Sequence, residues 1–167
     1  MATMNDWIAV AERIVAAANP DRVLAIGPRA RDVVAPLAER RPDVRITAAP
    51  DVDGEDPARA LHGLGRFDFA VAAGVLERIG IGAGRVLIGR VRDLHAPRML
   101  IAYDHAVEGG WTLADFIALG LTRIGAGAAT SGDTTLYGFD IASYKATPDW
   151  LNARHWANPE RWDKARW

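Results

Sequence analysis

Apolar residues recur along the first third of the chain with two different periods. Between residues 5 and 18 they return every three or four positions, as on one face of an amphipathic helix. Residues 23–26 are apolar without interruption and stop at a Gly-Pro pair, which is typical of a strand buried on both faces of a parallel sheet. Residues 32–40 carry another helical apolar face, and 44–48 read as a second strand. The chain therefore opens with helix, strand, helix and strand.

The rest of the chain continues this alternation and then changes it. Residues 50–65 are polar and have room for one short helix, near 57–64, so a third strand is expected to be reduced or absent. The next segments predict strand 67–74, a glycine-rich loop at 80–84, a helix through 86–94, strand 98–103 and helix 113–119. The β-rich stretch 134–144 is expected to pair with 122–124. We predict an α/β fold: a Rossmann-like, doubly wound, mostly parallel sheet with an antiparallel terminal hairpin.

Composition narrows the classes of function. Twenty basic and 21 acidic side chains give a net charge of −1, so no overall positive field attracts nucleic acid, and we do not expect it as a partner. The absence of cysteine excludes disulfides and a cysteine nucleophile. No apolar stretch reaches the roughly 20 residues that span a bilayer, and the beginning of the chain lacks a signal-peptide pattern. We expect a cytoplasmic protein without a membrane segment.

One segment has a recognisable signature. Residues 67–79 join a Phe-Asp pair, an apolar strand and the sequence Val75-Leu76-Glu77. They resemble the fourth-strand signature of small class I S-adenosylmethionine-dependent methyltransferases, whose sheet ends in the same antiparallel hairpin. The resemblance extends over roughly residues 23–144 and implies a methyltransferase-like domain over 1–146, with S-adenosylmethionine as cofactor. The whole chain also resembles an uncharacterised bacterial family of small, divergent methyltransferase-like proteins.

The resemblance implies a set of cofactor-binding positions. The family has a glycine-rich loop after the first strand, a carboxylate at the end of the second strand and further contacts after the fourth. The corresponding residues here are Gly27, Pro28, Arg29, Asp51, Gly74 and Glu77. Glycine allows the ligand to approach the backbone closely, and a carboxylate accepts hydrogen bonds from the ribose hydroxyls. Gly27 has a second interpretation, as a residue that only permits the turn, and Glu77 has one as a helix-terminus residue. No residue is assigned a catalytic role.

The chain also departs from the family pattern. Ala25 stands at the acidic position of the first strand, and Arg29 and Arg31 replace small residues of the loop. After the fourth strand, residues 72–75 lack the Asn or Asp and two prolines of amino-group methyltransferases, which argues against that subclass. Arginines at a predicted helix N-terminus also suit a phosphate or carboxylate ligand, although solvated surface arginines are the simpler interpretation.

Other candidate residues are weaker. Asp104 and His105 follow a strand at the edge where α/β sheets bind ligands and form a candidate acid–base pair. The remaining histidines are scattered without metal-ligand spacing, and the acidic segment 51–56 lacks the ligand order of a calcium loop. We predict no metal site, and a solvated acidic loop.

The end of the chain is rich in tryptophan. Four of the six tryptophans are Trp150, Trp156, Trp162 and Trp167. Capping residues followed by proline at 147–149 and 158–160 predict two short helices. Because short helices are marginal in water, we expect the tail 147–167 to pack on the domain 1–146. A protein-partner or homodimer surface and a nucleotide-stacking platform are the alternatives.

Two functions compete on this evidence. The first is a divergent S-adenosylmethionine-dependent methyltransferase with an unidentified acceptor, which predicts a cleft beside Gly27. The second is a catalytically inactive, methyltransferase-derived binding or assembly module that acts through the Trp-rich tail on a partner not identified by the sequence. It predicts a filled or shallow cleft.

Overall fold

A mixed six-stranded sheet is the centre of the fold in a computed structural model that describes residues 6–52, 54–124 and 134–144. Its strands are β1 Arg22–Ile26, β2 Arg45–Ala48, β3 Phe69–Ala73, β4 Arg98–Asp104, β5 Thr122–Arg123 and β6 Thr134–Asp140. They lie in the order β2-β1-β3-β4-β6-β5; the first four are parallel, and β6 runs antiparallel to both β4 and β5. This confirms the predicted parallel sheet with an antiparallel terminal hairpin. The described residues between β2 and β3 contain no strand, as the polar composition predicted.

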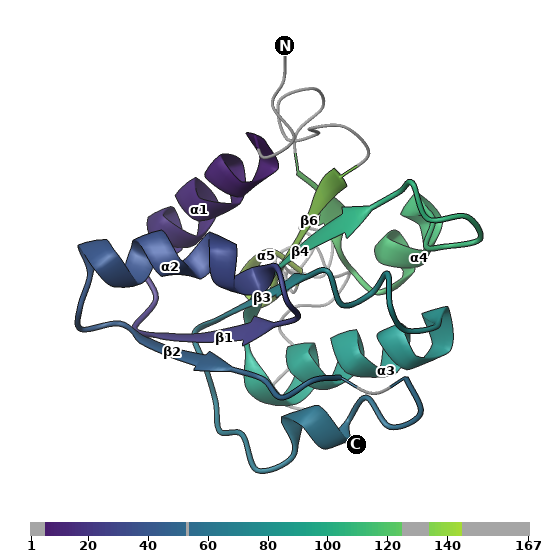
Figure 1. Ribbon diagram of the computed structural model, residues 1–167, viewed down its shortest axis with the longest axis horizontal. Helices are drawn as coiled ribbons and strands as arrows, with labels where there is room; N and C mark the ends of the chain where they lie inside the picture. The colour runs from purple at the N-terminus through teal and green to yellow at the C-terminus, as the bar shows by residue number, and fades with distance from the viewer. Residues whose placement is uncertain (1–5, 53, 125–133, 145–167) are drawn as a thin grey trace, which may run out of the picture.

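Helices cover both faces of the sheet (Figure 1). On one face lie α1 Asp6–Ala18 and α2 Ala30–Arg40. On the other lie α3 Ile81–Arg90, a following π-helical turn Val91–His95, α4 Leu113–Ala118 and the 3-10 turn Arg59–Leu61. The short helix α5 Ile141–Tyr144 follows β6. Because α2 connects β1 to β2 on one face and α3 connects β3 to β4 on the other, the sheet is doubly wound.

Alternation along the strands explains their uninterrupted apolar sequences. In β1, Val23 and Ala25 pack with α1 and α2, whereas Leu24 and Ile26 pack on the side of α3. The same division holds along β3 and β4. Both faces therefore exclude water, and the central strands carry no polar face. No helix of the described part is long and apolar enough to cross a membrane.

Several predicted boundaries differ in the structure, and two of the differences have a clear physical reason. The strand expected over 134–144 ends at Asp140, whose carboxylate accepts the N–H of Ala142 at 2.8 Å and starts the short helix α5. The expected glycine loop is shorter than predicted, because α3 begins at Ile81 and includes Gly84. A Cβ at Gly84 would collide with the ring of Trp111, so the glycine permits close packing within the helix.

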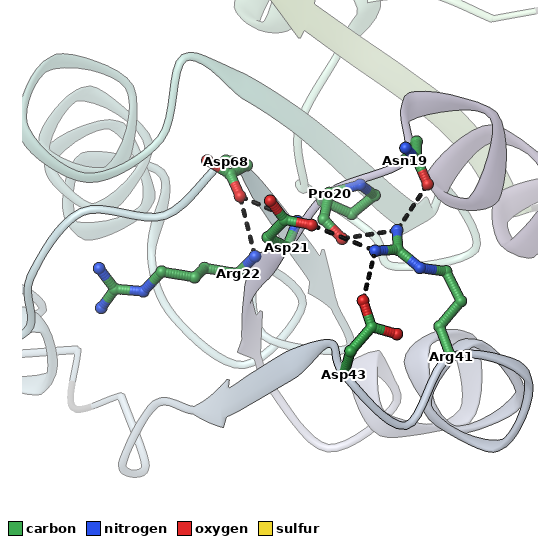
Figure 2. Close-up of polar contacts among 7 residues, drawn as sticks. All are labelled: Asn19, Pro20, Asp21, Arg22, Arg41, Asp43 and Asp68. Carbon is green, nitrogen blue, oxygen red and sulfur yellow. Dashed lines mark hydrogen bonds and ion pairs between the residues drawn. The ribbon is translucent and has the colours of Figure 1, made fainter.

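A polar network ties together the edge where the parallel strands begin (Figure 2). The carboxylate of Asp68 accepts the backbone N–H groups of Asp21 and Arg22, both at 2.9 Å. Arg41 forms ion pairs with Asp21 at 3.1 Å and Asp43 at 2.9 Å, and this contact lowers the pKa of Asp43. The aspartate of the Phe-Asp signature thus has a structural role, at the edge opposite the candidate site.

Candidate functional site

A cavity of about 310 Å³ opens at the carboxyl ends of β1 and β2. Its lining comes from the end of β1 with the turn that follows it, from residues 48–52 after β2, and from Arg31, Val75 and Arg78. The connections leave β1 and β3 on opposite faces, so this edge includes the point where the strand order reverses. Open α/β sheets bind ligands at such a point.

Gly27 forms the sharp turn at the end of β1. Its φ is +91°, and a Cβ would lie 2.5 Å from the carbonyl oxygen of Ala73 and 2.9 Å from Cβ of Val75. The turn also lets the N–H of Arg29 donate to that same oxygen at 3.2 Å. Packing against β3 therefore requires glycine here, and the residue lines the cavity as well.

Asp51 offers a carboxylate beside apolar walls. It follows β2, is exposed, and has no hydrogen-bond or ion-pair partner among the described residues. Val52 and Val75 form apolar parts of the lining. These groups fit the adenosine half of S-adenosylmethionine, since a carboxylate suits the ribose hydroxyls and apolar side chains suit the base.

The space over Gly74 is filled by side chains of the loop after β1. Gly74 has a φ of +73°, and the position of a Cβ there lies 3.1 Å from Cγ of Arg29 and 3.2 Å from Cγ of Pro28. The guanidinium of Arg29 continues to the ring of Trp7 in α1, 4.6 Å from its centroid. Arg29 is thus held beside the cavity by a cation–π contact.

Glu77 joins the loop after β3 to the end of β4. Its Oε1 accepts the N–H of Asp104 at 2.9 Å, while its Oε2 is buried and has no partner among the described residues. Burial raises the pKa of Glu77; the hydrogen bond from Asp104 opposes this rise, and the charge of the Asp104 carboxylate adds to it. The positive charge of Arg29 lowers the pKa of Glu77.

Asp104 and His105 are bound to different partners. The Asp104 carboxylate accepts the N–H of Ala106 at 2.9 Å, and Nε2 of His105 lies 2.8 Å from the hydroxyl of Tyr137. The His105 ring also meets Tyr103 edge-on, with centroids 4.9 Å apart. Within the described residues, the two side chains are not hydrogen-bonded to each other as an acid–base pair.

The structure thus divides the six predicted positions into two groups. Gly27, Pro28 and Asp51 line the cavity, whereas Arg29, Gly74 and Glu77 lie outside its lining, toward β3 and β4. Among the described residues, no group of three or more histidine, aspartate or glutamate side chains lies close enough to hold a metal ion.

Sequence reasoning missed several residues of this region. Val52, Val75 and Arg78 line the cavity; Val75 and Arg78 lie three residues apart, directly after β3 and the glycine that follows it, which was a readable signal. Trp7 was not predicted as the partner of Arg29, because their contact depends on how α1 packs and no local pattern encodes it.

The chain is similar in architecture to solved structures that are described as methyltransferases. The chain is similar to an O-methyltransferase family protein from Burkholderia thailandensis, with 14% identity and a TM-score of 0.56 over 80% of this chain and 54% of that protein. It is similar to a putative O-methyltransferase from Nostoc punctiforme, with 12% identity and a TM-score of 0.53 over 78% and 55%. Magnesium protoporphyrin IX methyltransferase from Synechocystis PCC 6803, solved with bound SAM, gives 15% identity and a TM-score of 0.57 over 82% and 78%.

These likenesses establish the fold as class I S-adenosylmethionine-dependent methyltransferase-like. The chain spans about half the length of the first two proteins. A comparison with curated proteins found no match. One family model, described as "Family of unknown function (DUF6231)", matches residues 5–167, and the chain therefore belongs to this family of methyltransferase-like fold.

Proposed function

We propose that this chain is a divergent S-adenosylmethionine-dependent methyltransferase that binds the adenosine half of its cofactor in the cavity beside Gly27. The observation that carries the proposal is the meeting of three features at one edge of the sheet: the glycine turn, the carboxylate of Asp51, which has no partner among the described residues, and the cavity of about 310 Å³. The proposal is supported by the similarity of the fold to that of methyltransferases. The proposal names no acceptor.

The residues of the chain have distinct tasks in this proposal. Asp51 accepts hydrogen bonds from the ribose, and Val52 and Val75 contact the base. Glu77 holds the loop after β3 against β4 through the N–H of Asp104. When bound, the cofactor supplies an electrophilic methyl group, and the protein contributes chiefly by positioning donor and acceptor.

A second function is favoured by one observation. The side chains of Pro28 and Arg29 occupy the space over Gly74, directly beside the cavity. If this filling prevents cofactor binding, the chain is an inactive, methyltransferase-derived module, and its interactions fall to the Trp-rich segment 147–167. That segment lies outside the described residues, so its packing on the domain 1–146 stays a proposal.

Calorimetric titration of the full chain with S-adenosylmethionine and S-adenosylhomocysteine separates the two functions. We expect both ligands to bind. We expect Asp51→Ala to weaken binding at least tenfold, because the variant lacks the carboxylate and its hydrogen bonds to the ligand, which are worth roughly 1.5–3 kcal/mol each. Asp32→Ala is the matched control, since it removes an exposed carboxylate of α2 that is not part of the cavity lining. Absence of heat at millimolar ligand would leave only the second function.

A further inference from the structure

An arginine that contacts a tryptophan ring lies next to the proposed adenosine cavity. Arg29 is half-buried, and among the described residues its guanidinium has no ion pair. Its main contact is the face of Trp7, at 4.6 Å. A partly desolvated guanidinium with free N–H groups is well prepared to bind an anion, because its planar fork matches carboxylate and phosphate oxygens.

Neighbouring acidic residues leave this charge available. The positive charge of Arg29 lowers the pKa of Glu77, but the hydrogen bond of Glu77 goes to the N–H of Asp104 and its second oxygen is buried without a described partner. Asp51, the carboxylate of the cavity, belongs to the chain after β2. In the strand order β2-β1-β3, Arg29 lies on the other side of β1, over Gly74 at the end of β3.

This arrangement gives the ligand a direction. A ligand whose ribose meets Asp51 on the β2 side and that crosses the end of β1 has its 5′ substituent on the β3 side, where Arg29 lies. Arg31 and Arg78 line the cavity itself and are separate from this position. The end of the ligand beyond the ribose is therefore directed toward Arg29.

We propose that Arg29 determines ligand specificity by pairing with a negatively charged group on the 5′ substituent of an adenosine ligand. The inference rests on the proposed function, because it takes the adenosine site at Asp51 as given. The anion is either the carboxylate of a methionyl group or a phosphate. Arg29, which replaces a small residue of the family loop, then has a binding role at this position.

Four ligands test the proposal by calorimetry on the full chain. S-adenosylhomocysteine carries the carboxylate and 5′-methylthioadenosine lacks it; adenosine 5′-monophosphate carries a phosphate and adenosine lacks it. In at least one pair, we expect the ligand that carries the carboxylate or phosphate to bind the wild-type chain at least tenfold more tightly than the ligand that lacks it. The pair that shows the difference identifies the anion.

Variants then assign the difference to Arg29. We expect Arg29→Ala to remove most of the tenfold difference and to leave the affinity for the neutral ligand within twofold, with Arg29→Lys retaining part of it. Arg31→Ala, a matched loss of one cation from the cavity lining, should preserve the difference. Circular dichroism and the melting temperature verify that each variant is folded. If Arg29→Ala does not fold, Arg29→Lys serves as the test.

Three results would overturn the proposal. Equal affinities within both pairs would show that no anion is recognised while leaving the adenosine site intact. Stronger binding of S-adenosylhomocysteine to Arg29→Ala would show that the side chain obstructs the site, and loss of the difference in Arg31→Ala would assign it to Arg31. Failure of all four ligands to bind would remove the adenosine site as well, so the two proposals fail in distinguishable ways.

Discussion

At the scale of single residues, Gly27 supports both the turn and the cavity. A side chain at this position would be strained by the φ of +91°, and its Cβ would also collide with the carbonyl oxygen of Ala73, 2.5 Å away. We expect Gly27→Ala to lower the free energy of unfolding by about 2–4 kcal/mol, measured by urea denaturation. Gly63→Ala is the control, because Gly63 has a φ of +77° and open space around it. Equal losses in both variants would contradict a steric cause.

A partly buried carboxyl group gives Glu77 a signature in the pH dependence of stability. Burial raises its folded pKa above the ordinary value of 4.5. The folded state then binds more protons than the unfolded state, so the contribution of Glu77 is favourable below about pH 4.5 and is lost as the pH rises through the folded pKa.

Glu77→Gln tests this sign, since glutamine is neutral and keeps an oxygen for the N–H of Asp104. We expect the variant to show a smaller fall in melting temperature than the wild type between pH 4.5 and 7. Glu77→Ala should instead have a lower melting temperature throughout, because the hydrogen bond is lost. Parallel pH profiles of wild type and Glu77→Gln would argue against a raised pKa.

At the scale of elements, Asp68 aligns the beginnings of two strands. Its carboxylate at the start of β3 accepts two N–H groups at the start of β1, as Figure 2 shows. We expect Asp68→Ala to destabilise the fold by roughly 1–3 kcal/mol in urea denaturation, because hydrogen bonds to charged groups are stronger than neutral ones. Asp43→Ala removes an exposed partner of Arg41 and should change stability little. A neutral effect of Asp68→Ala would show that backbone pairing alone sets this register.

The order of elements was predictable because the central strands are apolar on both faces and most helices bury an apolar face with a clear period. Boundaries failed where a single contact decided them: Asp140 ends β6 through the N–H of Ala142, and Trp111 accounts for glycine within α3. Asp140 is a recognisable capping residue, whereas the contact of Gly84 with Trp111 joins residues far apart in sequence. For the site, the resemblance supplied Gly27 and Asp51, which line one cavity, but the contact of Arg29 with Trp7 required the packed fold.

At the scale of the whole molecule, the edges of the sheet bear on self-association. The edge strands β2 and β5 are short, and each carries an exposed arginine, Arg45 and Arg123. Short, charged edges disfavour pairing with a strand of another chain. Association through the sheet edges is therefore not expected, and any homodimer would depend on another surface, of which the Trp-rich segment 147–167 is the first candidate.

Truncation after Lys145 tests what that segment does. It lies outside the described residues, but it follows α5, and Ser143 of α5 lines a cavity of about 290 Å³ whose apolar part includes Phe69, Leu100 and Ile124. We expect truncation to lower the melting temperature by about 5 °C or more and to increase binding of a hydrophobic dye, because tryptophans that pack on the domain protect apolar surface. An unchanged melting temperature together with lost self-association in light scattering would instead make the segment an interface between chains. Replacing Trp150 alone by alanine should give a smaller loss of the same sign, since it removes one packed side chain and leaves the rest of the segment in place.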